Sequence, residues 1–218
     1  FPPAERKMLK GVELSHRTHI DLNAMCNEVD IDYLCTPFDT GAMMFLAQHE
    51  PKMRYMKISS GHLKDWIMLD VARRQGIPII LSTGMATMQE KCQPEVIMHC
   101  VSAYPTAFED ANLKAITRLK RSYTHRTIGY SDHTMSIFIP AAAVAMGAKV
   151  IEKHVTFDQH WPGPDHHMSL TIKEFDLMVK GIRNVDLALS GDAALTTRPA
   201  CEDTVKAIVE ERRKHAHD

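Results

Sequence analysis

The chain has 218 residues, which is enough to bury one sizeable hydrophobic core in a single domain. It carries 26 Lys and Arg against 27 Asp and Glu residues, so the net charge is -1 with neutral histidines. A charge this close to zero provides no overall field to hold a nucleic acid, and the longest apolar stretch, 137–150, is too short to span a membrane. We therefore expect small-molecule partners, no nucleic acid and no membrane.

Five cysteines are scattered along the chain, without any Cys-x-x-Cys pair. An odd number of dispersed cysteines does not suggest a disulfide framework or a zinc site. The pattern indicates buried free thiols in a reducing compartment, and we expect no signal peptide. We expect a cytoplasmic location.

Apolar, strand-like segments alternate along the chain with helix-like segments. After the first predicted strands, residues 63–75 have helical spacing, two arginines near the end and Gly76 as a stop signal. Near the other end, residues 171–189 also show helical periodicity. The predicted strands are 31–38, 54–61, 77–84, 95–105, 126–134 and 148–156. Nearly continuous apolar strands separated by helices predict an α/β fold with a parallel sheet.

Polar side chains stand late in every predicted strand. They include Thr36, Lys57, Ser82, His99, Ser131, His133, Glu152, Lys153 and His154. In a parallel sheet these side chains gather at the carboxyl ends of the strands, where TIM barrels carry their active sites. A doubly wound sheet places its site mainly at one switch point, so six polar strand ends favour a barrel.

His133 and His154 follow two successive predicted strands at the same point, one βα unit apart. Two imidazoles on one rim can share a metal ion and leave open positions for water and a substrate carbonyl. The alternative interpretation is that each histidine only forms a hydrogen bond with its own loop. The matched positions favour the metal site.

Several motifs together resemble the N-acetylneuraminate (sialic acid) synthase family. They are TPFD, KISSG, PIILSTGMAT, HCVSAYPT, GYSDHT, EKHVTFD and PGPDHHMSL, and the similarity runs from about residue 13 to residue 190. The resemblance implies a (β/α)8 TIM barrel, of which about six βα units are visible in residues 1–190. It also implies a sialic or legionaminic acid synthase that condenses phosphoenolpyruvate with N-acetylmannosamine or a related amino sugar. Mn2+ or another divalent metal would assist, phosphate would be released, and a homodimer is compatible with the resemblance.

The resemblance also assigns roles to individual residues. His133 and His154 match the family's metal ligands, and Lys57 is the expected cation for the phosphate. Lys153 is the second choice for the phosphate, on the separate ground that it stands next to His154 in the sequence. The other positions that match substrate-binding residues are Ser60, Ser82, Ser102, Tyr104, Ser131 and Asp165. Serines in such loops also serve as helix caps, and an aspartate after PGP is also an ordinary turn residue.

Some features depart from the family pattern. His62 stands where an acidic residue is usual, and the two strands that normally precede TPFD, with their substrate-binding residues, are not in this sequence. Residues 191–218 are expected to form a charged helical tail in place of an antifreeze-like domain. The short connection after Gly84 predicts that residues are missing within 85–94, because a parallel crossover needs more length. A catalytically degenerate relative that binds a sugar, a phosphate or a protein is therefore the alternative function.

Overall fold

The computed structural model describes residues 10–49, 53–85 and 94–191, together with Lys7, Glu202, 205–207 and Val209. Two expectations fall largely or wholly outside these residues: the missing segment within 85–94 and the charged helical tail 191–218. Within the described part, no helix is both long and apolar enough to cross a bilayer.

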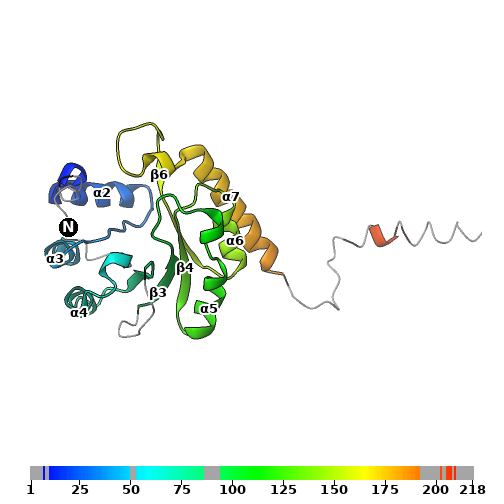
Figure 1. The fold of residues 1–218 in the computed structure, drawn as a ribbon, viewed down its shortest axis with the longest axis horizontal. Helices are drawn as coiled ribbons and strands as arrows, with labels where there is room; N and C mark the ends of the chain where they lie inside the picture. The colour runs from blue at the N-terminus through cyan, green and yellow to red at the C-terminus, as the bar shows by residue number, and fades with distance from the viewer. Residues whose placement is uncertain are drawn as a thin grey trace, which may run out of the picture.

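Five parallel strands form the main sheet, in the order in which they occur in the sequence (Figure 1). They are β1 (Met56–Ile58), β2 (Ile79–Ser82), β3 (Val96–Cys100), β4 (Thr127–Asp132) and β5 (Val150–Lys153). A two-stranded parallel sheet follows, formed by β6 (Val155–Thr156) and β7 (Leu170–Thr171). Each strand of the main sheet pairs with its neighbour in sequence, as in a barrel, and the sheet curls into a half-barrel.

Helices follow or precede the strands along the chain. They are α2 (His16–Glu28), α3 (Thr40–His49), α4 (Trp66–Arg74), α5 (Lys114–Ser122), α6 (Ile139–Ala145) and α7 (Ile172–Leu189), with short 3-10 turns at Ser60–His62, Phe108–Asp110 and His166–Met168. Local signals set their ends: Asp65 caps α4 through the Met68 N–H, and Thr171 and Glu174 form a capping box at α7. Gly76 follows α4 with a φ of 68°, which confirms the predicted stop.

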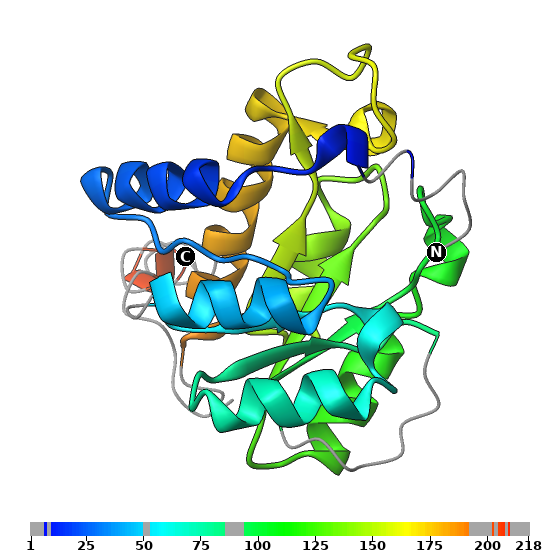
Figure 2. The ribbon, with the colours of Figure 1, turned by 90° about the vertical axis from the view of Figure 1, so that its left-hand side faces the viewer.

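Two hydrophobic clusters join the helices to the outer face of the sheet. One contains Met43, Ile58, Met68 and Leu81 and connects α3 and α4 to β1 and β2. The other contains Ile97, Ile116, Tyr130 and Ala143 and connects α5 and α6 to β3 and β4. Figures 1 and 2 show α4, α5 and α6 along this convex side, with α7 beyond β5. The predicted α/β architecture is therefore present.

The opposite, concave face of the sheet carries a group of polar side chains near the carboxyl ends of the strands. Side chains alternate between the two faces of a strand, so the residues between those of the outer clusters point inward. These inward positions include Lys57, Ser82, Cys100, Ser131 and Glu152. Below them a small apolar cluster of Ile80, Val96 and Met98 closes the floor. Because side chains alternate between the two faces, polar groups lie at one end of the concave face while the outer face keeps its apolar core.

The predicted strand at 31–38 is wrong, and the described residues do not show the six predicted βα units. Residues 31–37 have no strand assignment, and one backbone hydrogen bond, from Lys57 N to Cys35 O at 3.4 Å, links the segment to β1. An extended segment becomes a strand only when its backbone groups are paired in a ladder, and a single bond is not enough. In the described residues the main sheet keeps two edges, β1 and β5, so the complete eight-stranded barrel is not seen.

Candidate active site

A cavity of about 440 Å³ opens at the carboxyl ends of the main strands. Its lining includes seven of the predicted site residues: Lys57, Ser60, Ser82, Ser102, Tyr104, Ser131 and His133. They come from β1, β2, β3, β4 and the loops that follow them. The prediction that polar strand ends converge is confirmed for these seven residues. His154 and Asp165 do not line the cavity: the ring of His154 lies next to that of His133, which does, and Asp165 contacts His154.

Lys57 is held by a carboxylate of the chain itself. Its Nζ lies 3.1 and 3.0 Å from the two oxygens of Glu152, which stands on β5, at the opposite edge of the sheet. Ser131 donates a second hydrogen bond to Glu152 Oε1, at 2.8 Å. Lys57 is 5% exposed, and a lysine so deeply buried requires a partner. The sequence argument looked for that partner in a ligand, whereas the structure provides it internally.

The next part of the cavity wall is formed by Ser60, Ser82 and Ser102, with Gly84 packed against Ser60 and Ser102. The Gly84 N–H donates to Ser60 Oγ at 2.9 Å, which ties the loop after β2 to the turn after β1. A Cβ on Gly84 would lie 2.9 Å from Ser60 Oγ and 3.2 Å from Cys100 Sγ, so a side chain does not fit there. Ser82 Oγ is buried and, among the described residues, is the one buried side-chain polar atom with no hydrogen-bond partner. An unsatisfied hydroxyl in a cavity wall can form a hydrogen bond with a bound ligand.

His133 is fixed in one tautomer by its surroundings. Its Nδ1 lies 2.7 Å from the carbonyl oxygen of Val101, and a carbonyl accepts only, so Nδ1 carries the proton. The other ring nitrogen, Nε2, then carries no proton, and its lone pair can accept a hydrogen bond or bind a metal. Ser131 Oγ, which gives its proton to Glu152, is 3.5 Å from Nε2. The ring is 4% exposed and lies 4.2 Å, centroid to centroid, from the ring of Tyr104.

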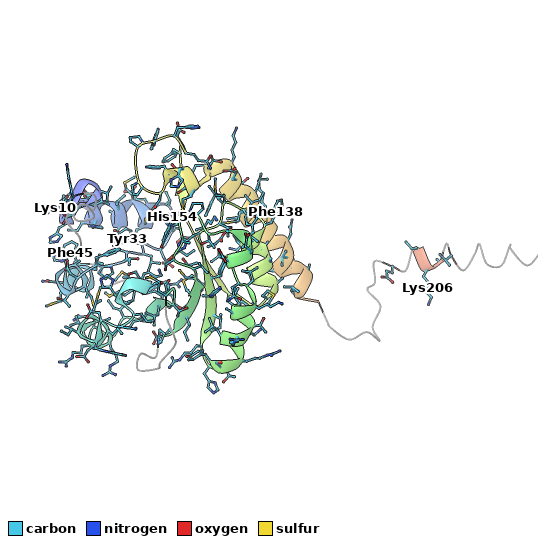
Figure 3. All side chains as sticks on the ribbon, in the orientation of Figure 1. Lys10, Tyr33, Phe45, Phe138, His154 and Lys206 are labelled. Carbon is cyan, nitrogen blue, oxygen red and sulfur yellow. The ribbon has the colours of Figure 1, made fainter. Side chains whose placement is uncertain are left out.

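His154 follows β5 as His133 follows β4. Asp132 and Lys153 are paired in the register of these strands, which places the two histidines side by side, with ring centroids 5.4 Å apart. His154 Nδ1 lies 3.6 Å from Asp165 Oδ2, on the loop before the 3-10 turn at His166–Met168. Figure 3 shows His154 on the side of the sheet that faces α2, with Phe138 on the side of α6 and α7.

The histidine pair fits a divalent metal with two protein ligands. His133 has a fixed tautomer with a free lone pair on Nε2, and a carboxylate stands beside His154, as is common around metal-binding imidazoles. No cluster of three or more His, Cys, Asp or Glu side chains suited to a metal occurs in the described part of the chain. Further ligands would therefore be water or substrate, and two imidazoles alone do not select Mn2+ over other first-row ions.

Two other ionisable groups of the cavity have shifted pKa values. Burial would raise the pKa of the Cys100 thiol, but hydrogen bonds and charge from His133, with hydrogen bonds from Ser60 and Ser131, lower it overall. Burial raises the pKa of Tyr104 to about 12, with smaller contributions from the charges of Cys100, Asp165 and Glu152. The phenol of Tyr104 is therefore a hydrogen-bond donor at neutral pH.

Lys153 does not belong to the cavity, so its place as second choice for the phosphate is wrong. Its side chain is 1% exposed and pairs with Asp132 Oδ2 at 2.6 Å. Asp132 also accepts hydrogen bonds from the Tyr130 hydroxyl and the Thr134 N–H, both at 3.0 Å. Because faces alternate along a strand, Asp132 and Lys153 point outward while the histidines that follow them point inward.

Seven residues that line the cavity are not among the predicted site residues: Phe38, Ser59, Gly61, His62, Met85, Cys100 and Glu152. The signal for Glu152 was its spacing. It precedes His154 by two positions, as Ser131 precedes His133, and residues two apart share one face of a strand. His62, noted as a departure from the family pattern, binds Ser59 Oγ through Nδ1 at 2.9 Å and contacts the ring of Phe38.

Comparisons with known proteins identify the family and the fold of this chain. The profile of the NeuB family matches residues 4–194. The N,N'-diacetyllegionaminic acid synthase of Legionella pneumophila is 37% identical, over 84% of this chain and 55% of that protein. The N-acetylneuraminate-9-phosphate synthase of Mus musculus is 34% identical, over 92% of this chain and 59% of that protein. The chain thus spans little more than half the length of these relatives.

A solved structure has the same arrangement. The crystal structure of N-acetylneuraminic acid (sialic acid) synthetase from Leptospira borgpetersenii, in complex with citrate, superposes with a TM-score of 0.83 at 31% identity. The match covers 98% of this chain and 76% of that one. The curled half-barrel is therefore similar to a large part of that protein's fold.

Proposed function

Because the chain belongs to the NeuB family, we propose that it condenses phosphoenolpyruvate with N-acetylmannosamine or a related amino sugar, forms a nine-carbon 2-keto sugar acid and releases phosphate. The observation that carries the proposal is the convergence of one buried lysine, an unsatisfied serine hydroxyl and a histidine pair at one cavity. The lysine and the hydroxyl suit an anionic substrate, and the histidines suit a divalent metal.

The phosphate of phosphoenolpyruvate is assigned to the part of the cavity between Lys57 and the serines. Lys57 Nζ supplies positive charge, and Ser60, Ser82 and Ser131 supply hydroxyl donors around it. Ser82 Oγ gains its missing partner in this arrangement. Donors that the fold holds in fixed positions stabilise the charge that builds on the departing phosphate.

The aldehyde of the open-chain sugar is assigned to the side of His133 and His154. A divalent ion bound there would polarise the carbonyl oxygen as a Lewis acid. His133 is oriented for this role by the Val101 carbonyl. Tyr104, whose ring contacts both histidines, remains protonated and can donate to a sugar hydroxyl. Asp165, beside His154, can accept a hydrogen bond from another sugar hydroxyl.

The reaction balances with these groups. C3 of phosphoenolpyruvate forms a bond with the aldehyde carbon, the aldehyde oxygen becomes a hydroxyl, and positive charge develops at C2. Water adds at C2 and loses a proton, and the tetrahedral intermediate collapses to the ketone. Phosphate leaves with its bridging oxygen, so the carbon–oxygen bond breaks and the phosphorus–oxygen bond does not.

Phosphate release from phosphoenolpyruvate tests the proposal. We expect release by the purified chain to require both N-acetylmannosamine, or a related amino sugar, and a divalent metal such as Mn2+, and to be lost in Lys57→Ala. Lys149→Ala, which removes an exposed lysine paired with Asp186, is the matched control and should be active. Binding of both substrates without any release would favour the degenerate relative.

A further inference from the structure

Glu152 contacts both of the groups that the phosphate is expected to need. Its two oxygens lie 3.1 and 3.0 Å from Lys57 Nζ, and Oε1 also accepts from Ser131 Oγ at 2.8 Å. Lys57 and Glu152 are 95 positions apart in the sequence and stand on the two edge strands, β1 and β5. The carboxylate therefore sits inside the cavity, where it imitates a bound anion.

Lys57 and Glu152 together give the cavity lining a net fixed charge of zero. Among the described residues that line it, Lys57 is the one lysine or arginine and Glu152 is the one carboxylate. An incoming dianion thus meets a lysine that is already neutralised, and a carboxylate that repels it. Ser131 Oγ has one proton to donate, and Lys57 Nζ has three, of which the two oxygens of Glu152 can occupy two. Phosphate therefore gains the Ser131 donor and the full charge of Lys57 only when Glu152 gives them up.

We propose that Glu152 is an internal counter-ion that the phosphate of the substrate replaces, so that Glu152 sets the affinity of the site for anions. This inference rests on the proposed function. Glu152 is a positioning residue in this role: it keeps Lys57 and Ser131 in place without substrate and gives them up to a stronger acceptor. A phosphate dianion brings more charge and more acceptor oxygens than a carboxylate and can displace it, whereas a small monoanion cannot.

The difference in exposure between Lys57 and Glu152 determines which side chain moves when phosphate binds. The Lys57 side chain is 6% exposed and stands among buried residues of β1, so the lysine has little room. The Glu152 side chain is 37% exposed and borders the open cavity, so it can leave the pair toward solvent. The structure thus has a fixed cation and a displaceable anion.

Titration of the whole chain with inorganic phosphate by calorimetry tests the exchange. Glu152→Gln keeps the size of the side chain and removes its charge, so we expect phosphate to bind about tenfold tighter than to the wild type, because a like charge at short range is gone. Glu152→Asp, a shorter carboxylate, should bind with intermediate affinity. Asp186→Asn, which neutralises a carboxylate paired with the exposed Lys149, is the matched control and should leave the affinity unchanged.

The direction of the change separates this role from a structural one. A damaged site binds anions more weakly, and only the removal of a competitor makes binding tighter. The same exchange predicts that phosphate raises the melting temperature of Glu152→Gln more than that of the wild type, because it restores a partner for Lys57. That second measurement applies even if the variant is poorly stable in phosphate-free buffer.

The outcomes distinguish the inference from the proposed function. If Glu152→Gln binds phosphate as weakly as the wild type or more weakly, while Lys57→Ala loses binding, the exchange is wrong and the phosphate site stands. If neither the wild type nor Glu152→Gln binds phosphate or phosphoenolpyruvate, and Lys57→Ala behaves as they do, the phosphate site and the exchange both fail.

Discussion

Lys153 forms an ion pair with Asp132 across β4 and β5, with 2.6 Å between Nζ and Oδ2. Both side chains are inaccessible to solvent, with exposed fractions of 1% and 0%. Each residue directly precedes one of the two histidines, and the two are register partners. The ion pair therefore ties together the strand ends that carry His133 and His154, from the face opposite the cavity.

Asp132→Asn should destabilise the protein strongly, because it leaves the ammonium group of Lys153 buried without a counter-ion. Loss of one partner of a buried pair costs about 3 to 5 kcal/mol of unfolding free energy. Asp186→Asn breaks the exposed pair with Lys149, 3.4 Å apart, and should cost less than about 1 kcal/mol. Urea unfolding of both variants measures the difference, and equal small losses would mean that the buried pair does not anchor these strands.

His133→Ala should abolish most divalent metal binding, because it removes the imidazole whose tautomer is fixed for coordination. Since even groups behind the ligands change metal affinity by about 10- to 100-fold, we expect a loss of at least about 100-fold for a ligand itself. Calorimetric titration with Mn2+ measures it. His160→Ala, at a histidine with a side chain 94% exposed, should bind as the wild type does. Unchanged affinity in His133→Ala would remove this residue from the metal site.

Gly84→Ala should weaken the binding of phosphoenolpyruvate, because the new methyl group meets Ser60 Oγ and Cys100 Sγ and displaces the serine from its place. Gly181→Ala is the matched control. Nothing lies within 4 Å of a Cβ at Gly181, in the middle of α7, and alanine there should raise the unfolding free energy by about 1 kcal/mol. Titration with phosphoenolpyruvate that gives wild-type affinity for Gly84→Ala would show that the serine wall is not part of the anion site.

Tyr104 should remain protonated well beyond the ordinary phenol range, because burial raises its pKa to about 12 from a usual 10.0. A pKa that is higher in the folded state contributes stability that is fully present below the unfolded pKa and is lost as the pH rises through the folded pKa. The difference in phenolate absorbance between the wild type and Tyr104→Phe, followed from pH 9 to pH 12.5, isolates this group. A Tyr104 transition near pH 10 would mean that the ring is solvated.

The convergence of the strand ends was predictable from the sequence, and the internal ion pair was not. The sequence shows polar residues late in successive strands, among them Lys57, Ser82 and Ser131, and parallel pairing brings such ends to one edge. The partnership of Lys57 with Glu152 depends on the curl of the sheet, which brings its edge strands within reach. Curl arises from tertiary packing and leaves no local pattern in the sequence.

The strand predicted at residues 31–38 is wrong for the same reason, because strand pairing also depends on tertiary packing. The segment has the apolar content of a strand, but composition does not determine whether neighbouring backbone groups are available for pairing. Lys153 was misplaced for a simpler reason, because an assignment by proximity to His154 ignored the alternation of faces along β5. Applied residue by residue, that alternation would have placed Glu152 in the site and Lys153 outside it.

The fate of the bridging oxygen of phosphoenolpyruvate tests the central claim most directly. The purified chain, phosphoenolpyruvate, N-acetylmannosamine and Mn2+ would be incubated in water enriched in oxygen-18, and the released phosphate and the sugar product analysed by mass spectrometry. The proposed condensation breaks the carbon–oxygen bond, so it predicts unlabelled phosphate together with a nine-carbon 2-keto acid. Labelled phosphate, or phosphate released without that acid, would show that the cavity hydrolyses phosphoenolpyruvate and would contradict the assignment as a synthase.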